Sequence, residues 1–212
     1  MRFEWVTLDD GRSGLEVARL DTGDATPPVT SLYLDHEPRT RPRDYLAVAS
    51  ALAFGQYIGE VFGPPSGMSE RVSAAIQQFL RPRSIRPIHV RGGSDDPVFG
   101  ERSLRAVSVV DPLRDTVRTD ERRDVFAIHL LRMDLFTGSV LSRDALWVAT
   151  NTDLVGAGSP LSALHAETAV AMLLAADLGA GSVQLSCRVG TSELTRLSAL
   201  VGAVGLGVVV TG

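Results

Sequence analysis

Residues 164–174 (LHAETAVAMLL) place His165 and Glu167 two positions apart at the start of an apolar run. A His-x-Glu pair can support zinc chemistry, with the histidine as a metal ligand and the glutamate as a proton shuttle, when a downstream pair of cysteines completes the site. The chain contains a single cysteine, Cys187, so these ligands cannot be assembled. We therefore predict no bound metal, and we interpret the stretch as the exposed start of a buried helix.

The lone cysteine is the best candidate for a nucleophile. Cys187 ends an apolar, strand-like segment and precedes a helix expected to begin near Thr191, whose N-terminal end would favour the thiolate. His165 could then act as the base. Asp153 or Glu167 could orient the imidazole, but residues two apart on a helix do not face each other, which favours Asp153 over Glu167. The competing interpretation is that a cysteine closing a strand is a small core residue.

Polar residues after the predicted strands could bind a substrate. Because the carboxyl ends of parallel strands share one edge of a sheet, segments 35–44, 151–167 and 187–193 should meet there. The arginines in these segments suit an anionic ligand, although each cluster could equally be a solvated loop. The candidate substrate-binding residues are Asp35, His36, Glu37, Arg39, Arg41, Arg43 and Arg188.

The composition narrows the class of protein. The chain has 212 residues, of which 44% are hydrophobic and 22% charged, as in an ordinary globular protein. All 21 basic residues are arginine, which excludes a lysine Schiff base and a Walker A lysine, and we predict no cofactor. A net charge of −4 argues against nucleic acid as a partner. Since no long apolar span or signal-peptide core is present, we expect a cytoplasmic protein without a membrane partner.

Similar segments recur along the chain at a slowly drifting spacing. Arg-x-Asp ends a strand-like run at residues 19–21 and again at residues 132–134. Three further pairs keep the same order: SLYLD at 31–35 with ALWVA at 145–149, LAVASAL at 46–52 with TAVAMLL at 168–174, and MSE at 68–70 with TSE at 191–193. We interpret these matches as an internal duplication, in which the Arg-x-Asp should have one structural role twice.

The hydrophobic periodicity predicts the same seven elements in each repeat, in the order βββαβαβ. We predict repeat one at residues 1–91, a linker at 92–104 and repeat two at 105–212. The fold class is α/β with pseudo-twofold symmetry, in which an antiparallel hairpin precedes parallel strands covered by helices. The predicted ranges are 2–8, 14–21, 29–35, 43–56, 58–62, 68–80 and 86–91 in repeat one, and 105–110, 124–133, 144–150, 160–178, 182–187, 192–204 and 205–211 in repeat two.

This element order is similar to that of ribonuclease H-like domains, and two such domains in tandem resemble the actin-like architecture. Phosphate-binding members of that group carry Asp-x-Gly-x-Thr/Ser in the first hairpin, which Asp9, Gly11 and Ser13 match here. The corresponding segment of repeat two, DPLRDT at 111–116, lacks the glycine. Because an actin-like nucleotide clamp needs both turns, the resemblance does not imply ATP as a cofactor.

Two functions remain open from the sequence. The first is a small enzyme of small-molecule metabolism, such as a specialised biosynthetic step, that acts on an anionic substrate by acid/base or cysteine chemistry. The second is a non-catalytic actin-like or scaffold protein that works as a homodimer or with a protein partner. An enzyme should gather perturbed titratable groups in one cleft, whereas a scaffold should expose an apolar patch.

Overall fold

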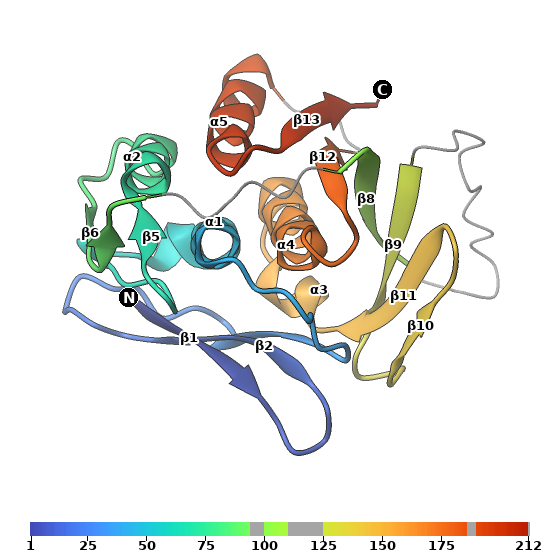
Figure 1. Cartoon of the computed structure of the whole chain (residues 1–212). Helices are drawn as coiled ribbons and strands as arrows, with labels where there is room; N and C mark the ends of the chain where they lie inside the picture. The colour runs from blue at the N-terminus through green and yellow to red at the C-terminus, as the bar shows by residue number, and fades with distance from the viewer. Residues whose placement is uncertain (94–99, 110–124, 186–189, 212) are drawn as a thin grey trace.

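The computed structural model describes residues 1–93, 100–109, 125–185 and 190–211, and within these ranges the chain is a mixed α/β protein (Figure 1). The helices are α1 (Arg43–Phe54), α2 (Glu70–Phe79), α3 (Thr152–Val155), α4 (Pro160–Leu174) and α5 (Thr191–Gly202), with a 3-10 turn, η1 (Gly55–Tyr57). The strands are β1 (Arg2–Thr7), β2 (Ser13–Ala18), β3 (Ser31–Leu34), β4 (Val61–Phe62), β5 (Met68–Ser69), β6 (Arg86–Pro87), β7 (Val90–Arg91), β8 (Arg102–Ser108), β9 (Val125–Arg132), β10 (Ser139–Leu141), β11 (Ala145–Thr150), β12 (Ala180–Leu185) and β13 (Gly207–Val210).

One nine-stranded sheet contains strands from both parts of the sequence. Its order is β1-β2-β3-β11-β9-β8-β12-β13, and β10 pairs with β11. The strands β1, β2 and β3 are antiparallel, β3 meets β11 antiparallel where Leu34 lies opposite Thr150, and β8, β9, β11, β12 and β13 run parallel. A bridge between Arg2 and Gly63 continues the pairing from β1 toward the small parallel sheet of β4 and β6.

The predicted antiparallel hairpin forms at the start of the first predicted repeat but not of the second. There β8 and β9 pair in parallel, with Ser103 opposite Val125, so that part of the prediction is wrong. A period of two in hydrophobicity identifies a strand but does not give its direction, which depends on the path of the chain between two strands. The sequence also did not predict β10 and α3, and the predicted strand at 86–91 is interrupted between β6 and β7.

The two most apolar helices, α1 and α4, pack on each other in the middle of the molecule, where the sheet curves around them (Figure 1). Residues 44–54 of α1 and 168–174 of α4 are all buried. For α4 this confirms the expectation that a helix apolar on nearly every side is covered on most faces. Residues 46–54 of α1 are covered in the same way, so they do not form an exposed apolar patch. Ser50 and Thr168 are buried on these helices, and each hydroxyl group donates to the carbonyl oxygen four residues earlier.

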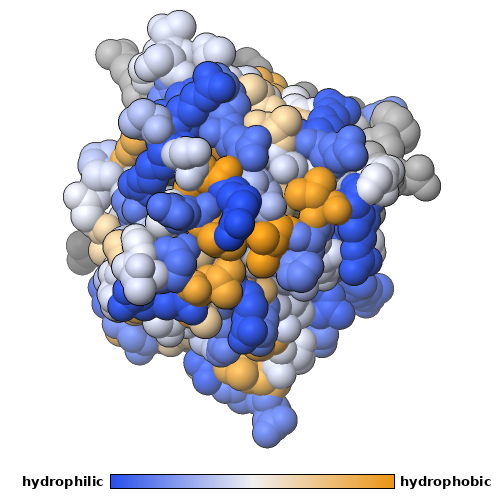
Figure 2. Space-filling model, turned by 90° about the vertical axis from the view of Figure 1, so that its left-hand side faces the viewer, coloured by the Kyte–Doolittle hydropathy of each residue, from blue (hydrophilic) through white to orange (hydrophobic). Residues whose placement is uncertain are grey.

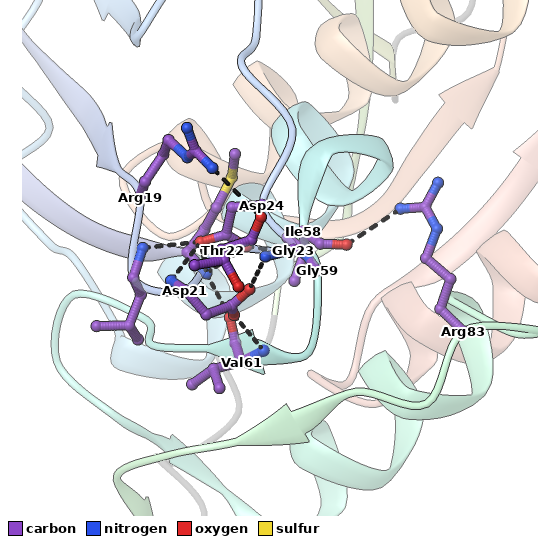
Figure 3. Close-up of polar contacts among 11 residues, drawn as sticks. Arg19, Asp21, Thr22, Gly23, Asp24, Ile58, Gly59, Val61 and Arg83 are labelled. Carbon is purple, nitrogen blue, oxygen red and sulfur yellow. Dashed lines mark hydrogen bonds and ion pairs between the residues drawn. The ribbon is translucent and has the colours of Figure 1, made fainter.

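The Arg-x-Asp motifs make different contacts in the two parts of the chain. Arg132 forms an exposed, bidentate ion pair with Asp134. Arg19 instead donates to the Thr22 carbonyl, whereas Asp21 accepts from the backbone of Gly23 and Val61 (Figure 3). The prediction that this motif has one structural role twice is therefore wrong.

Asp24 is the centre of a buried polar cluster that ties the first residues of the chain to the segment after α1 (Figure 3). Its side chain is fully buried and accepts hydrogen bonds from the Met1 amino group and from the backbone of Leu20, Asp21 and Gly59. Burial alone would raise the pKa of Asp24, but the hydrogen bonds from these donors outweigh burial and lower the pKa. With so many donors on one carboxylate, the cluster is a structural anchor.

Replacing Asp24 by asparagine should lower the free energy of unfolding by about 3 kcal/mol or more at neutral pH, because an amide nitrogen would face backbone donors and the buried amino group would lose its counter-charge. The wild-type contribution is present above the ordinary carboxyl pKa and is lost as the pH falls through the lowered pKa of the folded state. Urea unfolding at neutral and acidic pH measures both effects. Asp9→Asn, at an exposed position, is the control, and an equal effect of the two substitutions would contradict the assignment.

The hydrophobic core gives a second expectation. Leu173→Ala removes a side chain of α4 that is 3% exposed in the hydrophobic core. The free energy of unfolding should fall by about 2 to 5 kcal/mol, since the substitution leaves a cavity in a close-packed core. The matched control is Leu141→Ala, at a position that is 62% exposed, which should cost little. Urea denaturation followed by circular dichroism compares the two variants.

Candidate functional site

A pocket of about 260 Å³ opens where the ends of α1 and α2 meet the starts of α4 and α5. The pocket is lined on one side by residues from the end of α1 and from the turn after α2, and on the other by Ser159, Leu161, Ser162, His165, Glu193 and Arg196. Its volume lies slightly below the range of about 300 to 1,000 Å³ that is usual for ligand pockets, so it suits only a small molecule. The site therefore lies at the junction between the two predicted repeats.

His165 and Glu193 form the central polar contact of this pocket. Nε2 of His165 lies 2.9 Å from Oε1 of Glu193, and the two side chains are only 17% and 14% exposed. The other carboxylate oxygen, Oε2, accepts from Arg196 at 3.1 Å. A histidine nitrogen that faces a carboxylate carries the proton, so Nε2 donates to Glu193 and Nδ1 keeps its lone pair.

Burial lowers the pKa of His165, and this effect outweighs the hydrogen bond and the charge of Glu193, both of which raise it. The positive charge of Arg196 also lowers the pKa of His165. The imidazole is therefore neutral at neutral pH. A neutral imidazole with one free nitrogen can accept a proton.

Arginines give the pocket an excess of positive charge. Arg81, Arg83 and Arg196 line it, and Glu193 is its one carboxylate among the residues described. Arg83 donates to the carbonyl oxygens of Gly55 and Ile58, which follow α1. Figure 3 shows the contact with Ile58. Ser159 caps α4 by accepting from the Ser162 backbone, and because both serines line the pocket, the N-terminal end of α4 also faces it.

The remaining catalytic candidates point elsewhere. Glu167 lies on a different side of α4 from His165 and accepts from the backbone and hydroxyl groups of Ser108 at the end of β8, at 3.1 and 2.6 Å. Asp153 lies 3.7 Å from Arg132, in a smaller pocket at the carboxyl ends of β8, β9 and β11. Cys187 falls outside the described residues, so its proposed pairing with His165 stays a prediction.

The candidate substrate-binding residues before α1 contact neighbouring segments and do not line the larger pocket. Asp35 accepts from the backbone of Gly138, and His36 lies 3.2 Å from the Ser139 hydroxyl. The backbone of Arg39 donates to Asp177 at the end of α4. Glu37 accepts from the Thr7 hydroxyl and pairs with Arg41, whose guanidinium also lies over the Trp5 ring. Arg43 donates to the Gly93 carbonyl oxygen. Arg188 lies outside the described residues.

Sequence reasoning missed Glu193, Arg196, Arg81 and Arg83. Glu193 and Arg196 are three apart on a helix, a spacing at which side chains meet, but this pattern is common on solvent-exposed helices. The sequence pointed to His165 and to a meeting of segments 151–167 and 187–193, but it did not single out Glu193 within the second segment. Its partner comes from a helix 28 residues away in the chain, so their contact depends on how α4 and α5 pack.

No family model, no curated protein and no solved structure matches this chain. Among the described residues, no group of three or more His, Cys, Asp or Glu side chains could hold a metal ion. Within the same ranges, no helix has both the length and the apolar character to cross a membrane.

Glu167 offers a test of the electrostatics around α4. Burial raises its pKa, and the hydrogen bonds from Ser108 offset this only in part. A raised folded-state pKa favours the protonated form, so stability is full below the ordinary carboxyl pKa and is lost as the pH rises through the raised value. Glu167→Gln keeps the acceptor oxygen and should therefore raise the melting temperature at pH 7.

The gain should disappear at acidic pH, where the wild-type carboxyl is protonated in both folded and unfolded chains. Melting curves between about pH 3 and 8 measure this difference. Glu101→Gln, at an exposed position, serves as the control. A Glu167→Gln variant that is less stable than wild type at pH 7 would show that the charge is needed in the folded state.

Proposed function

We propose that the chain binds a small organic anion in the pocket between α1, α2, α4 and α5, and that His165 accepts a proton from this ligand. The observation that carries the proposal is the buried His165–Glu193 contact in a pocket that three arginines line. The sequence led us to expect an anionic substrate and acid/base chemistry, and the proposal assigns both to one pocket.

The charge of the pocket favours an anion over a neutral ligand. Arg83 and Arg196 donate to carbonyl oxygens that follow α1 and α2, and Arg196 also pairs with Glu193, so these contacts balance only part of their positive charge. Arg81 adds a third guanidinium, and the N-terminal end of α4 adds partial positive charge. Leu52, Leu80 and Leu161 contribute apolar surface, which suits a carboxylate or phosphate with an apolar body.

The alternative is a scaffold function, which would need an exposed apolar patch. Apolar residues gather near the middle of the face that carries α2 and β6, with hydrophilic residues around them (Figure 2). The large hydrophobic side chains that are most exposed are spread over several elements, and they are Leu20, Val90, Leu135, Val140, Leu141, Leu154, Leu161, Val209 and Val210. The gathering of titratable groups in one pocket favours ligand binding over a homodimer or a protein partner.

The internal duplication is part of the proposal. In support of it, the strands β3-β2-β1 and β11-β9-β8 follow the same order in the sheet, and in each part the next parallel strand lies beside the first. Their directions differ, because β1, β2 and β3 are antiparallel whereas β8, β9 and β11 are parallel, so only the first part keeps the hairpin of a ribonuclease H-like unit. The helices that would correspond, α1 with α4 and α2 with α5, pack on each other. A duplication in which the strand directions of the second copy changed would account for these features and would place the pocket between the two copies.

Benzoate and its neutral isostere benzamide test the proposed ligand class. We expect benzoate and inorganic phosphate to shift the imidazole resonances of His165 in NMR titrations at millimolar concentration, and benzamide to leave them unchanged. Arg81→Gln should weaken benzoate binding about tenfold, because it removes a charged hydrogen-bond donor from the pocket. Arg39→Gln, outside the pocket, is the matched control.

The same spectra follow the protonation of His165, which should titrate below the ordinary histidine value of about 6.5 and at a higher pH when an anion is bound. An anion that binds without affecting His165 would overturn the proton-transfer part of the proposal. Resonances that no anion shifts would overturn the binding site itself.

A further inference from the structure

We propose that Arg196 is a positioning residue that keeps the proton of His165 on Nε2 and so leaves Nδ1 as the nitrogen that reacts. This inference rests on the function proposed above, because it concerns the same base. Arg196 itself would not touch the reacting atoms; it would act through Glu193.

The carboxylate of Glu193 divides its two oxygens between two partners. Oε2 accepts from NH1 of Arg196 at 3.1 Å, and Oε1 lies 2.9 Å from Nε2 of His165. A carboxylate that is free to rotate could present either oxygen, or neither, to the imidazole. The guanidinium fixes the carboxylate plane, so Oε1 stays directed at Nε2.

Arg196 is in turn held by the end of α2. Its NH2 group donates to the carbonyl oxygens of Phe79 and Arg81, the latter at 3.3 Å. The guanidinium carbon lies 5.3 Å from the centre of the Phe79 ring, a cation–π contact, and the imidazole of His165 lies 5.4 Å from the same ring centre. One residue of α2 therefore contacts both ends of the His165–Glu193–Arg196 chain.

The simpler interpretation is that Arg196 only joins two helices, and the structure offers a matched control for it. At the other end of the α2–α5 pair, Arg71 of α2 donates to the carbonyl oxygen of Gly202 at the end of α5. Both arginines thus satisfy carbonyl oxygens of the partner helix, but only Arg196 contacts Glu193. A purely structural role predicts similar effects of Arg196→Gln and Arg71→Gln.

The position of the proton can be read directly from the ¹⁵N chemical shifts of the two imidazole nitrogens at a pH where His165 is neutral. We expect the Nε2–H form to exceed the Nδ1–H form by about tenfold or more in the wild type and in Arg71→Gln, since a hydrogen bond to a charged group stabilises it. In Arg196→Gln the preference should fall severalfold. Arg196→Lys keeps the charge but not the planar fork, so it should lie between the two.

An Arg196→Gln protein that folds and keeps the wild-type preference would overturn the inference, whatever its melting temperature. If Arg196→Gln does not fold, the test uses Arg196→Lys instead. An unchanged preference for the Nε2–H form in Arg196→Lys would then overturn the inference. Glu193→Gln should lose the preference, which verifies that the measurement reports on this contact.

The two proposals fail separately. Benzoate that binds to the wild type while the proton position is unaffected by Arg196→Gln would leave the pocket's function standing and remove the role of Arg196. A proton position that depends on Arg196, in a protein that binds neither benzoate nor phosphate, would keep the positioning role and overturn the proposed function.

Discussion

The contact between α1 and α4 is the constraint on which the rest of the structure depends. Both helices are apolar around nearly their whole circumference, so neither can face water along its length. The sheet covers the pair by curving around it, and α2 packs against α1 (Figure 1). Only the ends of the buried helices then remain accessible. Polar chemistry near this core is consequently confined to helix ends, which is where the pocket lies.

Helix ends impose their own requirement, because the last carbonyl groups of a helix have no partner within it. In this chain arginines satisfy much of that requirement at three places: Arg83 after α1, Arg196 after α2 and Arg71 after α5. A guanidinium has five donors, so it can serve carbonyl oxygens and still bind a carboxylate. Arg196 does both, which links the capping of a helix to the geometry of the His165–Glu193 pair. An absence of lysine is compatible with these roles, since an ammonium group could not fill them with the same planar geometry.

The sequence was informative where local pattern decides the outcome. The apolar run 168–174 identified a buried helix, and periodicity identified most of the strands and helices, although not β10 or α3. The direction of β9 relative to β8 was missed, because it depends on a connection rather than on alternation. His165 was recognised by its residue type, but its partner was not. Glu193 occupies the first turn of α5, where the helix dipole favours any acidic residue, so nothing in the local sequence distinguishes it from a capping group.

The location of the pocket couples its chemistry to the packing of the whole chain. His165, Glu193 and Arg196 come from α4 and α5, while the carbonyl groups that hold Arg196 follow α2, and α2 is in contact with α1. The geometry of the Glu193 carboxylate thus depends on residues of two helices and on a carbonyl group that follows a third. Because protein interiors are close-packed, these helices can hold one arrangement only when the hydrophobic core between them is filled. The core that stabilises the fold is therefore also what brings the three polar side chains of the pocket together.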